Sequence, residues 1–218
     1  MKKITIGWAP ITLWLLGSLA ILSGIFRTLV TGEALATGVM PEDPADLHYV
    51  NHAALTLLHV IPGTLFLLLG PLQFIADIRN RWPWLHRLSG VVFILSGLTF
   101  AITALIIDLT FPTFGGPFKR LAVWVFSIAQ IATLLVAVMA IRKRQIMRHR
   151  AWMMRAFAVG LGISTMRFYF IPAYLLFGVP SNFTIALGMW VGFGLNLLIA
   201  EWILWRERKP AAPLPIPG

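Results

Sequence analysis

The sequence predicts an all-α fold, a polytopic membrane bundle of about six transmembrane helices with both termini in the cytoplasm. Of its 218 residues, 58% are hydrophobic and only 12% are charged, whereas a soluble domain carries about 25% charged residues. Apolar runs of about 20 residues recur along the chain, and each is long enough to cross a hydrocarbon core of about 30 Å. These residues form continuous blocks rather than alternating with polar ones, which argues against a membrane β-barrel.

The six helices are predicted to form a single domain over residues 1–209. We expect them at residues 8–30, 50–76, 88–109, 119–141, 150–177 and 183–206. The first could pass for a signal peptide, but its apolar run is longer than the h-region of such a peptide. The tail over residues 210–218, PAAPLPIPG, is too rich in proline to form a helix. We expect it to be extended or disordered and regard it, with the glycine-rich helix faces, as a place where other membrane subunits could bind.

The net charge of +10 is distributed unevenly among the loops. The first expected loop contains acidic residues and no basic ones, namely Glu33, Glu42, Asp43 and Asp46. The fourth, IRKRQIMRHR, is the most basic stretch of the chain. The positive-inside rule therefore places the basic loops and both termini in the cytoplasm. There the basic side chains would face anionic lipid headgroups, so nucleic acid is not an expected partner.

Few sequence motifs point to a known chemistry. The chain has no cysteine, which excludes disulfides and thiolate metal sites. It contains no phosphate-binding loop, zinc-binding helix or serine-nucleophile motif. Asp108, Glu201 and Asn196 are polar residues that a proton or ion path could use, but Asp108 falls on a different helix from the other two and the three lie at different depths. The sequence leaves open whether the protein is an enzyme.

Two ionisable residues are expected well inside the membrane, where such groups are costly and are candidates for a functional site. His59 lies about nine residues into the second expected helix, which corresponds to about 13 Å of helical rise. Arg167 lies at a similar depth in the fifth. With Gln73 they could form a pocket open to the outside. The alternative is structural: Arg167 pairs with Asp108 or a backbone carbonyl, and His59 bonds a neighbouring helix.

The second expected helix also has a distinctive face, which carries His52, His59, Gly63, Gly70 and Gln73. Their spacing places all five on one stripe. Glycines on such a stripe let another helix approach closely, so packing alone would explain them. Packing does not explain a histidine at that depth.

His86 and His149 stand at the starts of the third and fifth expected helices, at the cytoplasmic side. Two imidazoles facing each other across a helical bundle can hold the iron of a b-type haem, with arginines pairing its propionates. Arg87, Arg148, Arg150 and Arg155 are available for that role. The alternative is that both histidines contact lipid headgroups. A second, outer haem lacks a ligand, because the fourth expected helix contains no histidine.

The stretch LHVIPGTLFLLLGPLQFIADIRNRWPWLHRLSG, followed later by RHRAWMMRAFAVGLGISTMRF, resembles the predicted bacterial membrane proteins of domain-of-unknown-function family 2306. The resemblance covers residues from about 50 to 170 and departs from the family pattern at Ser89-Gly90-Val91. It implies a helical bundle in the bacterial cytoplasmic (inner) membrane and no settled activity. The matching positions are His59, Gly63, Gly70, Gln73, Arg79, His86, Arg87, Gly90, His149, Trp152, Met153, Arg155 and Arg167.

Three functions remain open at this point. The first is a redox or electron-transfer protein that uses haem b or a quinone, with His86 and His149 as iron ligands and His59 and Arg167 in a quinol pocket. The second is a non-enzymatic accessory subunit of a larger membrane complex. The third is a transporter or sensor that holds a small anion between His59 and Arg167.

Overall fold

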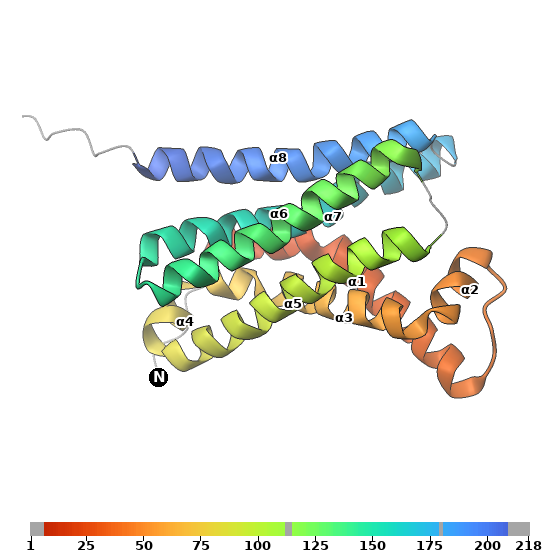
Figure 1. Cartoon of the computed structure of the whole chain (residues 1–218), viewed down its shortest axis with the longest axis horizontal. Helices are drawn as coiled ribbons and strands as arrows, with labels where there is room; N and C mark the ends of the chain where they lie inside the picture. The colour runs from red at the N-terminus through yellow and green to blue at the C-terminus, as the bar shows by residue number, and fades with distance from the viewer. Residues whose placement is uncertain (1–6, 112–114, 179–180, 209–218) are drawn as a thin grey trace, which may run out of the picture.

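The computed structural model describes residues 7–111, 115–178 and 181–208, and these form helices and no strands. The tail over residues 210–218 lies outside the described residues. Figure 1 shows the helices running roughly side by side, with α2 at one end of the molecule and α4 at the other. The elements are α1 (Trp8–Thr37), α2 (Pro44–Asn51), α3 (Ala53–Leu69), a 3₁₀ turn (Pro71–Phe74), α4 (Ala76–Arg81), α5 (Pro83–Thr110), α6 (Gly116–Arg142), α7 (Ile146–Phe177) and α8 (Asn182–Arg208).

Six of these helical segments are long and apolar enough to cross a membrane, which confirms the predicted all-α bundle of about six transmembrane helices. They are Trp8–Thr37, Ala53–Phe74, Pro83–Thr110, Gly116–Arg142, Ile146–Phe177 and Asn182–Glu207. Large apolar side chains cover their outer surfaces, as expected where the solvent is lipid. Examples are Leu15, Leu29, Leu175 and Leu198, each at least 65% exposed.

The structure differs from the predicted boundaries mainly around the second helix. That segment is split at His52, which separates the short α2 from α3. It also ends early, because Pro71 has no N–H to bond the carbonyl of Leu67 and the chain turns into a 3₁₀ helix. The first helix continues to Thr37 and stops at Gly38, whose φ of 73° favours glycine.

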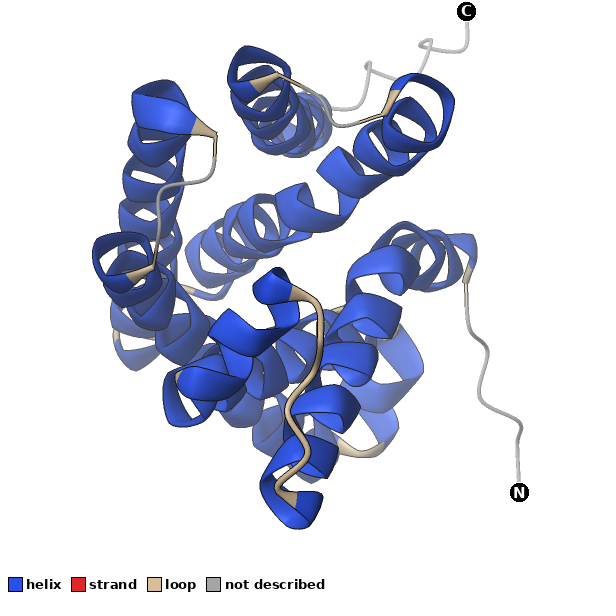
Figure 2. Cartoon of the chain, turned by 90° about the vertical axis from the view of Figure 1, so that its right-hand side faces the viewer, coloured by secondary structure: helices blue, strands red, loops and turns tan. Residues whose placement is uncertain are grey.

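Five long helices form a closed ring in which each packs against two neighbours, in the order α1, α3, α5, α6, α7 and back to α1. Helix α8 packs outside this ring against α6 and α7. Figure 2 views the bundle from its α2 end and shows these helices in cross-section. A ring of five helices leaves more space along its axis than a four-helix bundle does, and side chains must fill that space or line a cavity.

Aromatic side chains fill the middle of this ring of helices. Phe66 stacks on Phe93 with ring centroids 4.1 Å apart, and Phe157 packs beside both. Gly160 provides the room, since a Cβ built there would lie 2.3 Å from the Phe66 ring. A Cβ built on Gly70 would lie 2.0 Å from the Phe157 ring. Gly70, which was predicted to let another helix approach, therefore makes room for an aromatic ring. This aromatic layer separates the α4 end of the bundle from the α2 end.

Candidate functional site

Between the aromatic layer and the α2 end lies a cavity of about 590 Å³. All five ring helices, α2 and α8 contribute side chains to its wall. Most of the wall is apolar, with Phe66, Phe100, Phe126 and Phe193 among its aromatic residues. The charged or hydrogen-bonding side chains on it are Ser23, Arg27, Tyr49, His59, Thr64, Asp108, Lys119, Ser127, Gln130 and Arg167.

His59 and Arg167 lie at the same level on helices α3 and α7. These helices run in opposite directions, and Phe66 of α3 packs against Gly160 of α7. Seven residues are almost two full helical turns, so a step of seven returns to the same face of a helix. His59 is seven residues before Phe66, and Arg167 is seven residues after Gly160. Both steps lead toward the α2 end, so the two side chains face each other across the cavity.

The ring of His59 is held in one tautomer by helix α5. Its Nδ1 lies 3.1 Å from the carbonyl oxygen of Phe100 and 3.1 Å from the hydroxyl of Thr103. The carbonyl can only accept, so Nδ1 must donate. The Thr103 hydroxyl donates elsewhere, to the carbonyl of Thr99 at 2.8 Å. In this tautomer the other ring nitrogen, Nε2, carries no hydrogen and can only accept a hydrogen bond.

Arg167 uses only one of its five N–H groups within the described residues. Its Nη1 donates to the carbonyl oxygen of Ile163 at 2.9 Å, one turn earlier in its own helix. No carboxylate among those residues forms an ion pair with it. The two contacts of the structural alternative, a backbone carbonyl for Arg167 and a neighbouring helix for His59, both occur. Among the residues that the structure describes, they leave the positive charge of Arg167 without a counter-charge and four of its donors without an acceptor.

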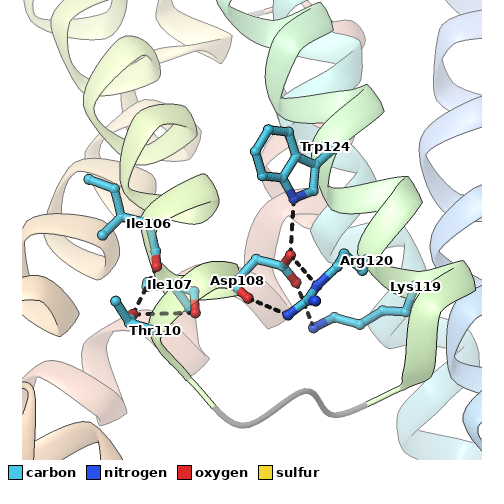
Figure 3. Close-up of polar contacts among 7 residues, drawn as sticks. All are labelled: Ile106, Ile107, Asp108, Thr110, Lys119, Arg120 and Trp124. Carbon is cyan, nitrogen blue, oxygen red and sulfur yellow. Dashed lines mark hydrogen bonds and ion pairs between the residues drawn. The ribbon is translucent and has the colours of Figure 1, made fainter.

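Asp108 bonds other residues instead of Arg167. Its carboxylate, only 2% exposed, accepts hydrogen bonds at Oδ2 from Arg120 Nε at 3.0 Å and from Trp124 Nε1 at 3.1 Å. Lys119 Nζ lies 3.8 Å from Oδ1. Figure 3 shows these side chains of α6 converging on the end of α5. The cluster joins α5 and α6 at the α2 end and supplies the only carboxylate among the described lining residues.

Helix α2 covers this end of the cavity through Arg27 of α1. Arg27 forms an ion pair with Asp46, and its guanidinium lies 4.2 Å from the centre of the Tyr49 ring. Phe111 lies against α2 as well, with its ring 4.3 Å from that of His48. Arg27, Tyr49 and Lys119 were not predicted to line the pocket. The signal that could have indicated the role of Arg27 is its positive charge within a long apolar run of α1.

Gln73 does not line this cavity, so its assignment to the outer pocket is wrong. It lies in the 3₁₀ turn beyond the aromatic layer, where its Nε2 donates to the hydroxyl of Ser89 at 2.8 Å. Gln73 was assigned to the same face as His59 on the assumption that the helix continues past Leu69, where α3 ends. The glutamine that does line the cavity is Gln130 of α6, which is 1% exposed.

The other predicted site residues lie near the α4 end. His149 Nδ1 is 2.9 Å from the carbonyl oxygen of Ala137, and His86 Nδ1 is buried without a hydrogen-bond partner among the described residues. Neither histidine lines the 590 Å³ cavity. Arg87 Nε donates to the carbonyl of Pro83 at 3.2 Å, and Arg155 forms an ion pair with Glu201. Their role as haem-binding residues stays a prediction.

The suggested polar path is not continuous in the part of the chain that the structure describes. Asp108 belongs to the cluster at the α2 end, whereas Glu201 pairs with Arg155. Asn196 exchanges hydrogen bonds with Thr165 at 2.9 and 3.2 Å. Each of these three residues is part of a separate local contact, so no proton or ion path follows from them.

Comparisons with known proteins agree with the resemblance seen in the sequence. A family described as "Predicted membrane protein (DUF2306)" matches residues 56–204, which extends the matched region beyond the two motif blocks into α8. Neither a curated protein nor a solved structure matches the chain. The matched region includes His59, Gln130 and Arg167. Because it covers more than half of the sequence, the chain belongs to this family of membrane proteins.

Proposed function

We propose that this membrane protein binds an organic anion in the cavity and acts as a transporter or a sensor for it. The observation that carries the proposal is the guanidinium of Arg167, which faces His59 across the cavity with no carboxylate partner among the described residues. An uncompensated charge at membrane depth is costly. A bound anion would supply the missing counter-charge.

The other charges on the wall also favour an anion. Arg27, Lys119 and Arg167 bring three positive charges, and Asp108 brings one negative charge. Asp46, which is not on the wall, neutralises Arg27. Asp108 is shared between Lys119 and Arg120. The cavity therefore has an excess of positive charge, and Arg167 is the cation with the least compensation.

The apolar wall indicates the rest of the ligand. Pockets of about 300–1,000 Å³ hold molecules of drug-like size, oriented by a few polar groups. Here aromatic and aliphatic side chains form most of the surface around Arg167 and His59. The ligand that fits this arrangement has an acidic head and an apolar body. With the α4 end in the cytoplasm, as the positive-inside rule predicts, it would enter from the outside or from the outer leaflet.

Naphthylbutanoate and its neutral amide form a matched pair of probes for this proposal. The acid is expected to bind the protein in lipid nanodiscs at least about tenfold more tightly than the amide, because only the acid forms charge-assisted hydrogen bonds with Arg167. Titration calorimetry measures both affinities, with empty nanodiscs as the background. Naphthyl phosphate distinguishes recognition of phosphate from recognition of carboxylate. Equal affinities for acid and amide, or binding of no anion, would contradict the proposal.

A b-type haem held by His86 and His149 is a second proposal, favoured by the Nδ1 of His86, which is buried and has no hydrogen-bond partner in the described part of the chain. His149 fits the same role, since its Nδ1 bonds Ala137 and leaves Nε2 for iron. A haem there would supply electron transfer, and the cavity with His59 and Arg167 would then take a quinol.

Purified protein with haem is expected to show a Soret band that the double variant His86→Ala/His149→Ala lacks. Imidazole nitrogens are the iron ligands in this proposal, and alanine removes both. Absorption spectroscopy of the two proteins after growth with added haem precursor is the measurement. A colourless preparation of the folded protein would rule the haem out.

A further inference from the structure

Gln130 is one of the polar side chains on the cavity wall that the proposed function does not use. It is 1% exposed, lies near the middle of α6 and lines the cavity. Neither Nε2 nor Oε1 of its amide has a hydrogen-bond partner among the described residues. Of the other cavity-lining groups, the hydroxyl of Thr64 on α3 and Oδ1 of Asp108 on α5 share this property.

A buried amide with no partner is unusual, because almost all buried polar groups in proteins are hydrogen-bonded. Leaving one unsatisfied costs about 1–3 kcal/mol. Apolar side chains pack tightly next to Gln130. Leu134, one turn later in α6, is completely buried and packs against Gly97. An apolar residue at position 130 would therefore avoid this cost, unless the amide has a partner that enters the cavity.

We propose that the ligand carries a neutral amide group within its apolar body, and that this group hydrogen-bonds to Gln130. The inference rests on the proposed function, since Arg167 would hold the acidic head of the same molecule. Gln130 can donate through Nε2 to the amide carbonyl or accept at Oε1 from the amide N–H. The ligand class is thus an acid with an internal amide, such as an N-acyl amino acid, rather than a simple fatty acid.

Three probes of equal length separate these interactions. Naphthoylglycine has both the amide carbonyl and the N–H. A keto analogue has a methylene in place of the N–H, and naphthylbutanoate has methylenes in place of both groups. Calorimetric titration in nanodiscs gives the affinity of each probe for the native protein and for Gln130→Met. The ratio between native protein and variant cancels differences in the hydration and lipid partitioning of the probes.

The native protein is expected to bind naphthoylglycine about three- to tenfold more tightly than naphthylbutanoate, the gain of one neutral hydrogen bond. In Gln130→Met that preference is expected to disappear while naphthylbutanoate binds as before. The affinity of the keto analogue shows whether Nε2 or Oε1 makes the contact. Gln73→Met, which alters a glutamine outside the cavity, should keep the native preference.

Gln130→Met should fold, because methionine has a similar size and removes a buried group without a partner. Its melting temperature is expected to equal or exceed that of the native protein. If the three acids bind equally well to the native protein, or if Gln130→Met weakens all three by the same factor, the inference is wrong and the proposed function stands. If none of the acids binds, the proposed function itself fails.

Discussion

Replacing Arg167 with methionine is expected to weaken the binding of naphthylbutanoate by about ten- to a hundredfold. Hydrogen bonds to charged groups contribute about 1.5–3 kcal/mol each, which corresponds to that range of affinities. Methionine keeps the volume and the apolar stem of the side chain and removes only the charge and the donors. Titration calorimetry in nanodiscs measures the change directly.

The variant should remain folded, which makes the binding result interpretable. Arg167 has no carboxylate partner among the described residues, so its removal leaves no buried negative charge behind. Arg148→Met is the matched control on the same helix. Arg148 is exposed, contacts the amide oxygen of Gln145 at 3.2 Å and lies outside the cavity, so its loss should not change the affinity. Equal losses in both variants would mean that the long-range field, and not Arg167, attracts the anion.

The fold class was predictable because a bilayer imposes a minimum length on each apolar segment. All six predicted crossings correspond to helices of the structure. The segment that was not predicted is one whose structure depends on polar contacts and not on its hydropathy. Helix α2 begins at Pro44 and contains polar residues, so hydropathy does not mark it. Its position depends on the contacts of Arg27 with Asp46 and Tyr49, which join residues from separate helices.

The site was predictable only in part, since a sequence gives the depth of a residue but not its neighbours. His59 and Arg167 were expected at similar depths, and depth follows from counting residues along a helix. That they face each other depends on the contact between Phe66 and Gly160, which sets the register of α3 against α7. No pattern in either helix specifies that register. Gln73 was misplaced for the opposite reason, because the helical stripe was continued beyond the end of the helix at Leu69.

Asp108→Asn is expected to lower the free energy of unfolding by about 2–3 kcal/mol. Removing one partner of a buried ion pair typically costs about 3–5 kcal/mol, and the partial exposure of Arg120 reduces the loss here. The carboxylate is 2% exposed, whereas the Arg120 side chain is 43% exposed. Asparagine retains an acceptor for Trp124 but provides no charge for Arg120 or Lys119. Denaturant titration in detergent micelles, followed by tryptophan fluorescence, measures the difference.

Glu207→Gln is the control for this effect, because it breaks an ion pair with Arg150 in which both side chains are 39% exposed. Such a pair contributes less than about 1 kcal/mol. Asp108→Asn should lower the stability of the protein but raise its affinity for the anion. The reason is that Lys119 then faces the cavity without a counter-charge. Naphthylbutanoate should therefore bind more tightly to this less stable variant. A variant that loses both stability and affinity would mean that Asp108 shapes the cavity rather than neutralising it.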